Sequence, residues 1–68
     1  MKARVMIVRD NHGKIVGQLE HCRDTNGNTF DTNTMYDSRE RPKVQQITIR
    51  DNQGHVESRT ILNGKLLP

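Results

Sequence analysis

The chain has 68 residues, of which 31% are hydrophobic, with 11 basic and 8 acidic side chains and a formal net charge of +3. The length allows one small domain, residues 1–68, and the low net charge argues against disorder. No apolar run approaches the about 18 residues of a membrane span or forms the core of a signal peptide, so we expect a cytoplasmic protein with no membrane partner.

The apolar content is small for a folded domain, because only fifteen residues are Val, Ile, Leu or Phe. Domains of this size usually need a disulfide, a metal or a partner besides their own core. Cys22 is the only cysteine, which excludes an intrachain disulfide and fits a reducing compartment. We therefore expect a homo-oligomer, together with a protein partner.

An internal repeat organises the sequence. The pattern Arg-Asp-x-x-Gly begins at Arg9, Arg23 and Arg50, and a related segment without the glycine begins at Tyr36. The aspartates of these four segments lie 13 or 14 positions apart. Asp at the first position of a turn binds backbone amides two residues on, and Gly at the fourth accepts a left-handed backbone. The repeat predicts four hairpin turns with strands between them.

The strands are expected between these turns, where β-branched residues are frequent. In chain order their ranges are 2–9, 14–23, 28–36, 42–50 and 55–62, followed by a turn at Asn63-Gly64 and a short sixth strand at 65–67. The segment 28–36 is mostly polar, and a loop is the alternative there. We predict an all-β fold, an antiparallel meander of five to six strands joined by Asp-x-x-Gly hairpin turns.

The first strand is apolar on both sides, because Val5 and Ile7 alternate with Met6 and Val8. In an open meander this strand would be an exposed apolar edge, which natural proteins avoid. We therefore expect either a small closed barrel, with Gly17 at a bend, or an open sheet completed by dimerisation. The four alternating residues, 5–8, are the predicted oligomer interface.

Residues that could carry catalysis or bind a metal are scattered. His21 and Cys22 are neighbours, so a strand directs them to opposite faces, and no Cys or His pair has the spacing of zinc ligands. Ser38 and Ser58 stand in no nucleophile motif. We predict no enzymatic activity, no metal and no cofactor.

Basic residues gather at one end of the predicted sheet, where the turns 10–13, 37–41 and 63–64 meet. The segment 37–43 is expected to be the longest loop, because it lacks the turn glycine, and long loops often carry function. The basic residues that could contact nucleic acid there are Lys14, Arg39, Arg41, Lys43 and Lys65.

The function predicted from these features is a non-catalytic β-sheet protein-interaction module that self-associates. The alternative is a small basic protein that binds DNA or RNA through the 37–43 loop and nearby Lys and Arg residues. A third hypothesis, an enzyme whose site forms between subunits, has no residue to carry it.

Overall fold

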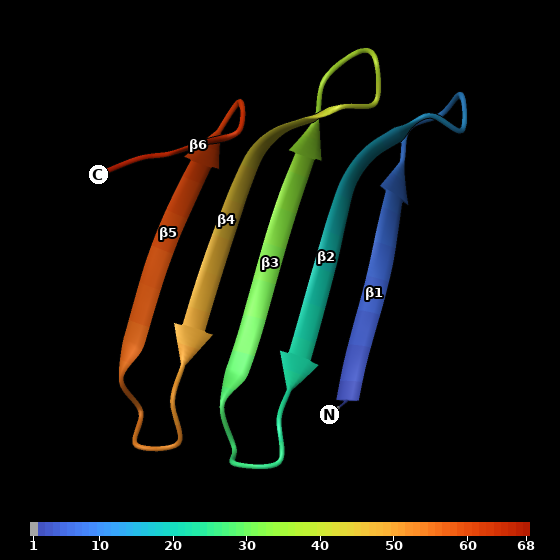
Figure 1. Ribbon diagram of the computed structural model, residues 1–68. Coiled ribbons are helices and arrows are strands. Elements are labelled where there is room, and N and C mark those ends of the chain that lie inside the picture. Colours follow the sequence, from blue (N-terminus) through green and yellow to red (C-terminus); the bar gives the residue numbers. More distant parts are fainter. Residues whose placement is uncertain (1) are drawn as a thin grey trace.

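The computed structural model describes residues 2–68 as one open sheet of antiparallel strands, arranged in chain order (Figure 1). The strands are β1 (Lys2–Arg9), β2 (Ile15–Arg23), β3 (Thr29–Tyr36), β4 (Pro42–Arg50), β5 (Val56–Leu62) and β6 (Lys65–Leu66). The predicted all-β antiparallel meander is confirmed, and the polar segment 29–36 is a strand rather than a loop. Within residues 2–68, no helix is long and apolar enough to cross a membrane.

The sheet does not close into the small barrel that was one of the two expected outcomes. β1 pairs only with β2, and β6 pairs only with β5, so the two edges stay apart (Figure 1). Closure requires a progressive stagger between strands. Here the registers shift only at Val8/Arg9 and at Met35/Tyr36. The first shift lies beside Gly17, but it does not bend the sheet into a barrel. The open sheet is the alternative that the structure shows.

Four of the five connections share one turn geometry, which Asp10 illustrates. Its N–H donates to the carbonyl of Lys14 at 2.9 Å, and its carbonyl accepts from the N–H of Gly13 at 3.1 Å. Its carboxylate accepts from the N–H groups of His12 at 2.8 Å and Lys14 at 3.0 Å. The carboxylate thus binds amides that the strand ladder cannot pair. The same contacts recur in the turns that start at Asp24, Asp37 and Asp51.

The segment 37–43 is not the long loop that the sequence suggested. β4 begins at Pro42, so the connection is 37–41, as long as the other three Asp turns, and Lys43 lies in a strand. Glu40 occupies the glycine position of the turn with a φ of 60°. A left-handed conformation is unfavourable for a residue with a Cβ. The missing glycine therefore marks a strained copy of the same turn, not a longer loop.

No hydrophobic residue in the described part of the chain is buried. Only Thr34, in the middle of β3, falls in the buried class there, at 5% exposure. On the edge strand, Val5 and Met6 are 57% and 60% exposed. A β-sheet must normally cover one face against another layer of structure, and the extents of 41 × 28 × 14 Å leave room for only one layer.

The turn geometry predicts opposite effects for two substitutions. Glu40→Gly should stabilise the protein by about 1 kcal/mol, because glycine carries no penalty at positive φ. The substitution also removes a contact of Glu40 Oε1 with the N–H of Ile15, but at 3.3 Å this contact is long. Gly54→Ala should destabilise by about 1 kcal/mol, because Gly54 has a φ of 87°.

Urea unfolding at one fixed chain concentration measures both effects. Space around Gly54 is open, so the added methyl group meets nothing and only the backbone term is tested. Changes of the same sign in the two variants would contradict this account of the turns.

Candidate interaction surfaces

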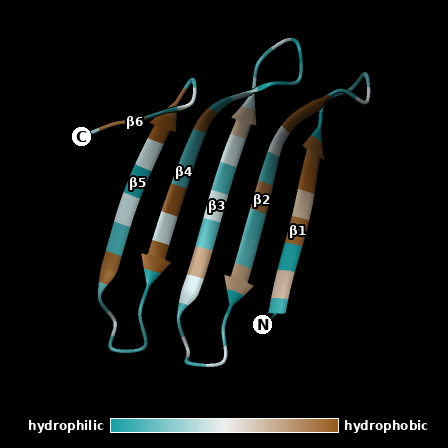
Figure 2. Ribbon diagram, viewed as in Figure 1, coloured by the Kyte–Doolittle hydropathy of each residue, from teal (hydrophilic) through white to brown (hydrophobic). Residues whose placement is uncertain are grey.

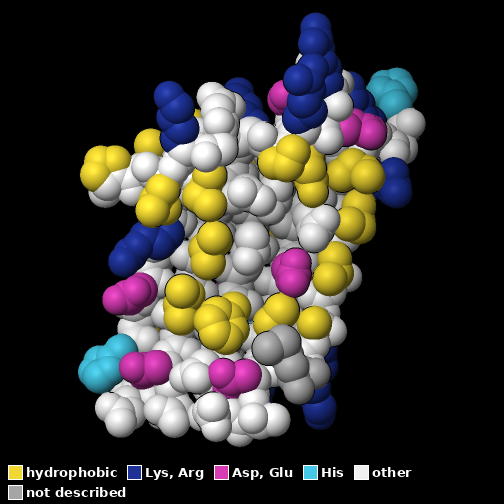
Figure 3. Space-filling model, in the orientation of Figure 1, with side chains coloured by type: hydrophobic (Ala, Val, Ile, Leu, Met, Phe, Trp, Pro, Cys, Tyr) yellow, Lys and Arg dark blue, Asp and Glu magenta, His cyan; other side chains and the backbone are white. Residues whose placement is uncertain are grey.

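The strand registers sort the side chains into two faces, because paired residues lie on the same side and successive residues alternate. One of them, here called the apolar face, carries four of the five isoleucines and the single phenylalanine. Its apolar members are Ala3, Val5, Ile7, Cys22, Phe30, Ile47, Ile49, Ile61 and Leu66. Figure 2 shows the alternation along β4, and Figure 3 shows apolar side chains spread over the sheet with few charges among them.

Between the two ends of the sheet, the apolar face holds three charged residues. Glu57 and Arg59 lie on β5, with Arg59 Nη2 3.5 Å from Glu57 Oε2. Glu20 lies on β2 and takes part in no ion pair within residues 2–68. It accepts a hydrogen bond from the thiol of Cys22 at 3.4 Å. This hydrogen bond and partial desolvation raise the pKa of Cys22, so the thiol stays protonated and unreactive at neutral pH.

A polar row crosses the apolar face and accounts for its one buried side chain. The hydroxyl of Tyr36 donates to Gln18 Oε1 at 3.2 Å, and Gln45 Nε2 lies 3.5 Å from Thr34 Oγ1. Gln18 and Gln45 are the cross-strand partners of Thr34 on either side, so their long side chains cover it. This row of polar side chains separates the apolar residues around Phe30 from the apolar residues that lie at the two ends of the row.

The four predicted interface residues of β1 divide between the two faces. Val5 and Ile7 lie on the apolar face, and Met6 and Val8 lie on the opposite one. All four are exposed, and no strand pairs with the outer edge of β1. The structure thus places Val5 and Ile7 on the same face as the apolar residues of β3 and β4, which lie 20 or more positions further along the chain.

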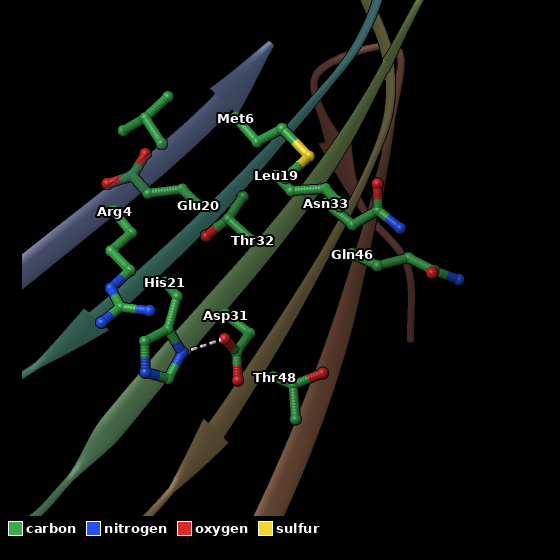
Figure 4. Close-up of a pocket in the computed structure, with 11 residues that line it drawn as sticks. Arg4, Met6, Leu19, Glu20, His21, Asp31, Thr32, Asn33, Gln46 and Thr48 are labelled. Atoms are coloured by element: carbon green, nitrogen blue, oxygen red, sulfur yellow. Dashed lines mark hydrogen bonds and ion pairs between the residues drawn. The ribbon is translucent and has the colours of Figure 1, made fainter. Parts of the chain in front are cut away.

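The opposite face is hollowed by a groove of about 790 Å³, shown in Figure 4. Met6 and Leu19 supply its apolar wall, and His21 Nδ1 is hydrogen-bonded to Asp31 in it. The imidazole and the carboxylate are both about half exposed. We therefore call this the groove face.

Among the described residues, the cross-strand partners of the His21–Asp31 pair supply no nucleophile to His21. Across the sheet, Arg4 is the partner of His21, while Thr48 lies beyond Asp31. A triad needs its nucleophile on the far side of the imidazole from the carboxylate. Cys22 faces the other side of the sheet, as the sequence predicts. Within the described residues, no group of three or more His, Cys, Asp or Glu could hold a metal ion.

The basic residues proposed from the sequence lie at one end of the sheet, here called the basic end. The turns 10–14, 37–41 and 63–64 are together there (Figure 1). Lys14 Nζ donates to the carbonyl of Ser38, which links two of these turns. The other cations at this end are exposed, and no ion pair of the described chain includes any of them. These cations are Arg39, Arg41, Lys43 and Lys65.

The acidic groups at the basic end are turned toward the backbone. The carboxylate of Asp37 accepts from the N–H of Arg41 at 3.0 Å and from that of Arg39 at 2.8 Å. These two hydrogen bonds, the one from Arg41 first, lower the pKa of Asp37. Glu40 likewise accepts from the N–H of Ile15. The surface of this end is therefore dominated by positive side chains, seen as the dark blue group at the top of Figure 3.

No family model, no curated protein and no solved structure matches this chain.

The sequence predicted an interface only on β1, and most residues of the apolar face were not predicted to belong to it. Phe30, Ile47, Ile49 and Ile61 belong to that face, and so does the unpaired charge of Glu20. The alternation within each strand was visible, but strands can be aligned into faces only if the turns have known lengths. Four turns of equal length supply that alignment.

The Asp turns predict how stability responds to acid. Hydrogen bonds from the side chain of Asn28 lower the pKa of Asp24, and backbone hydrogen bonds lower those of Asp37 and Asp51. A lowered folded-state pKa stabilises the fold above the unfolded value of about 3.9, and the stabilisation is lost as pH falls through the folded-state pKa.

Urea midpoints measured from pH 6 to pH 2 should therefore fall mainly below pH 4. Replacing the three aspartates by asparagine keeps acceptor atoms but removes the charge, and should flatten most of this decline. A triple variant with an unchanged slope would contradict the role given to the carboxylates.

Proposed function

We propose that this protein is a non-catalytic interaction module that self-associates, with its apolar face covered by another copy of the chain. The observation that carries this proposal is the lack of any buried hydrophobic residue within residues 2–68 of a single chain. A sheet of one layer has no interior in which to hide its apolar side chains. The second layer must then come from outside the chain.

The composition of the apolar face supports this proposal. Monomeric soluble proteins rarely expose a contiguous apolar patch larger than a few hundred Å². Here each of the six strands contributes at least one apolar residue, and Phe30, Ile47 and Ile49 are only partly covered by their neighbours. Obligate interfaces resemble a domain core cut in half, which is the character of this face.

Apolar residues on the groove face at the edge of the sheet suit a second kind of contact. Met6 and Val8 lie on the groove face at the unpaired edge of β1. An exposed edge can accept a strand from another protein, whose side chains then enter the neighbouring hollow. We assign this edge and groove to a protein partner, in a module that needs no cofactor.

The chemistry of the surfaces favours binding over catalysis. The thiol of Cys22 has a raised pKa, and the His21–Asp31 pair faces no nucleophile across the sheet. A reduced lone cysteine also suits the cytoplasm, where we place the protein.

Ile47→Glu tests the proposal, because Ile47 lies in the middle of the apolar face. Sedimentation velocity from about 1 to 100 μM should show a self-associating parent chain and a variant whose dissociation constant is at least about tenfold higher, the effect of about 1.4 kcal/mol. Circular dichroism of the same samples measures whether the dissociated chains lose their β-sheet structure.

Gln46→Glu is the matched control, since the neighbouring Gln46 is exposed on the groove face. It adds the same charge to the same strand and should leave association unchanged. A parent chain that stays monomeric and folded over the whole concentration range would overturn the proposal.

The basic end supports a second candidate function, binding of DNA or RNA. The favourable observation is that the carboxylates of Asp37 and Glu40 accept backbone amides, while Arg39 and Arg41 remain exposed beside Lys43. Phosphate contacts of this kind make binding strongly dependent on salt.

Fluorescence anisotropy with labelled single- and double-stranded DNA and RNA, at about 50 and 200 mM salt, tests this candidate. Replacing Arg39 and Arg41 by alanine should weaken binding and reduce the salt slope by about two. The control is the pair Arg23→Ala and Arg50→Ala, which removes the same charge from the other end of the sheet. Equal losses in the two double variants would assign binding to net charge alone and remove the basic end as a site.

A further inference from the structure

We propose that two copies pack apolar face to apolar face about a two-fold axis that runs parallel to the strands between β3 and β4. In this dimer Glu20 of each copy pairs with Arg59 of the other. The inference rests on the proposed self-association and specifies its partner and geometry.

One cross-strand row carries the argument. The registers place Val5, Glu20, Thr32, Ile47 and Arg59 side by side on the apolar face, one from each of the five long strands. Glu20 on β2 and Arg59 on β5 are equally far from the line between β3 and β4. With strands about 4.8 Å apart, each lies about 7 Å from that line.

A two-fold rotation about this line exchanges β2 of one copy with β5 of the other and β3 with β4, and it keeps the height along the strands. Glu20 then faces Arg59 of the second copy, twice in the dimer. Sheets that pack face to face lie about 10 Å apart with strands about 30° from parallel. At a crossing angle of about 30° the axis runs about 15° from the strands of each copy. Positions about 7 Å from the axis are then displaced by only a few Å, which the long Arg side chain can follow.

The rows on either side also match under this rotation. Phe30 and Ile49 are cross-strand partners on β3 and β4, so each faces the other residue in the second copy. Ile7 on β1 comes to face Leu66 on β6, because both belong to the row that includes Ile61. In the same rows Cys22 comes to face Glu57, which keeps its contact with Arg59, and Gln18 comes to face Ile61. No two like charges are opposed.

A two-fold axis in the same plane but perpendicular to the strands gives a worse match. It stacks each strand on its own copy, so an axis through the Glu20 row opposes Glu20 to Glu20 and Arg59 to Arg59. Moving the axis by half a row, toward β2 residue Cys22, opposes Glu20 to that thiol and buries a carboxylate without a cation. A buried charge without a partner is strongly destabilising.

The face is large enough for a stable dimer. A standard interface buries about 800 Å² per partner, and the sheet extends over 41 Å by 28 Å. In one copy Glu20 has no ion pair among the described residues, while Arg59 contacts Glu57 at 3.5 Å and remains half exposed. The second copy supplies the missing cation for Glu20 without removing the Glu57 contact.

Charge reversal tests the arrangement. Glu20→Arg and Arg59→Glu, each studied alone, place like charges opposite one another twice per dimer. Each should raise the dissociation constant at least about thirtyfold in sedimentation velocity, the lower range for breaking a buried pair. The double variant should return to within about threefold of the parent.

Mixing the two single variants is the sharper experiment. A heterodimer of a Glu20→Arg chain with an Arg59→Glu chain restores both opposite-charge contacts, so the mixture should dimerise although neither variant does alone. If the single variants lose their strands as monomers, mixing should restore the β-sheet signal in circular dichroism. Within one chain the two positions lie three strands apart, so an intrachain contact cannot produce this rescue.

The outcomes separate this inference from the proposed function. Single variants that dimerise like the parent, or a mixture that does not associate, would overturn the geometry while self-association stands. Rescue between Glu57→Arg and Arg59→Glu chains instead would point to the perpendicular axis and overturn the inference in the same way. A parent chain that is a folded monomer would overturn both.

Discussion

The carboxylate of the aspartate that opens each of four turns is the interaction on which the rest of this structure depends. It binds the amides two and four residues on, which gives the four connections the same length. Equal connections place successive strands in direct register with little stagger. Register decides which side chains share a face, because a slip of one residue moves a whole strand's side chains to the other side. The two faces, the open edges and the gathered basic turns all follow from this repeated local contact.

A sheet with so little stagger extends sideways instead of closing, and this has an energetic consequence. Most isoleucines and the phenylalanine are sorted onto one face, but no second layer of the described chain covers them. The hydrophobic contribution to stability, roughly 25 cal/mol per Å² buried, is thus largely unrealised in one copy. In one copy, the hydrogen bonds between strands and within turns would have to offset the entropy of ordering the strands by themselves. A second copy on the apolar face would bury the same side chains that the turns have aligned, which links folding to association.

The strand order and the strand boundaries could be predicted from the sequence because the repeat is local. Asp-x-x-Gly marks a turn by its own chemistry, and the segments between turns contain alternating residues. The polar strand β3 followed from turn spacing, since Thr and Asn residues gave no hydrophobic signal. The closed barrel, one of the two predicted outcomes, was wrong. Closure depends on the stagger summed over all pairs of neighbouring strands, which no single turn reveals. The segment 37–43 was misread because Glu40 replaces the glycine while the Asp37 contacts persist. Glu20 could not be recognised as a charge without an ion pair on the apolar face until its cross-strand partners, Val5 and Thr32, were known.

The concentration dependence of thermal unfolding tests the central claim most directly. If the apolar face is covered only when two chains meet, the midpoint temperature must rise with chain concentration, because association stabilises the folded state by mass action. We predict a rise of several degrees between about 2 and 200 μM, with loss of strand signal at the lowest concentrations at room temperature. A midpoint that is the same over this hundredfold range, with an intact sheet in the dilute sample, would show that one layer is stable by itself and would contradict the account.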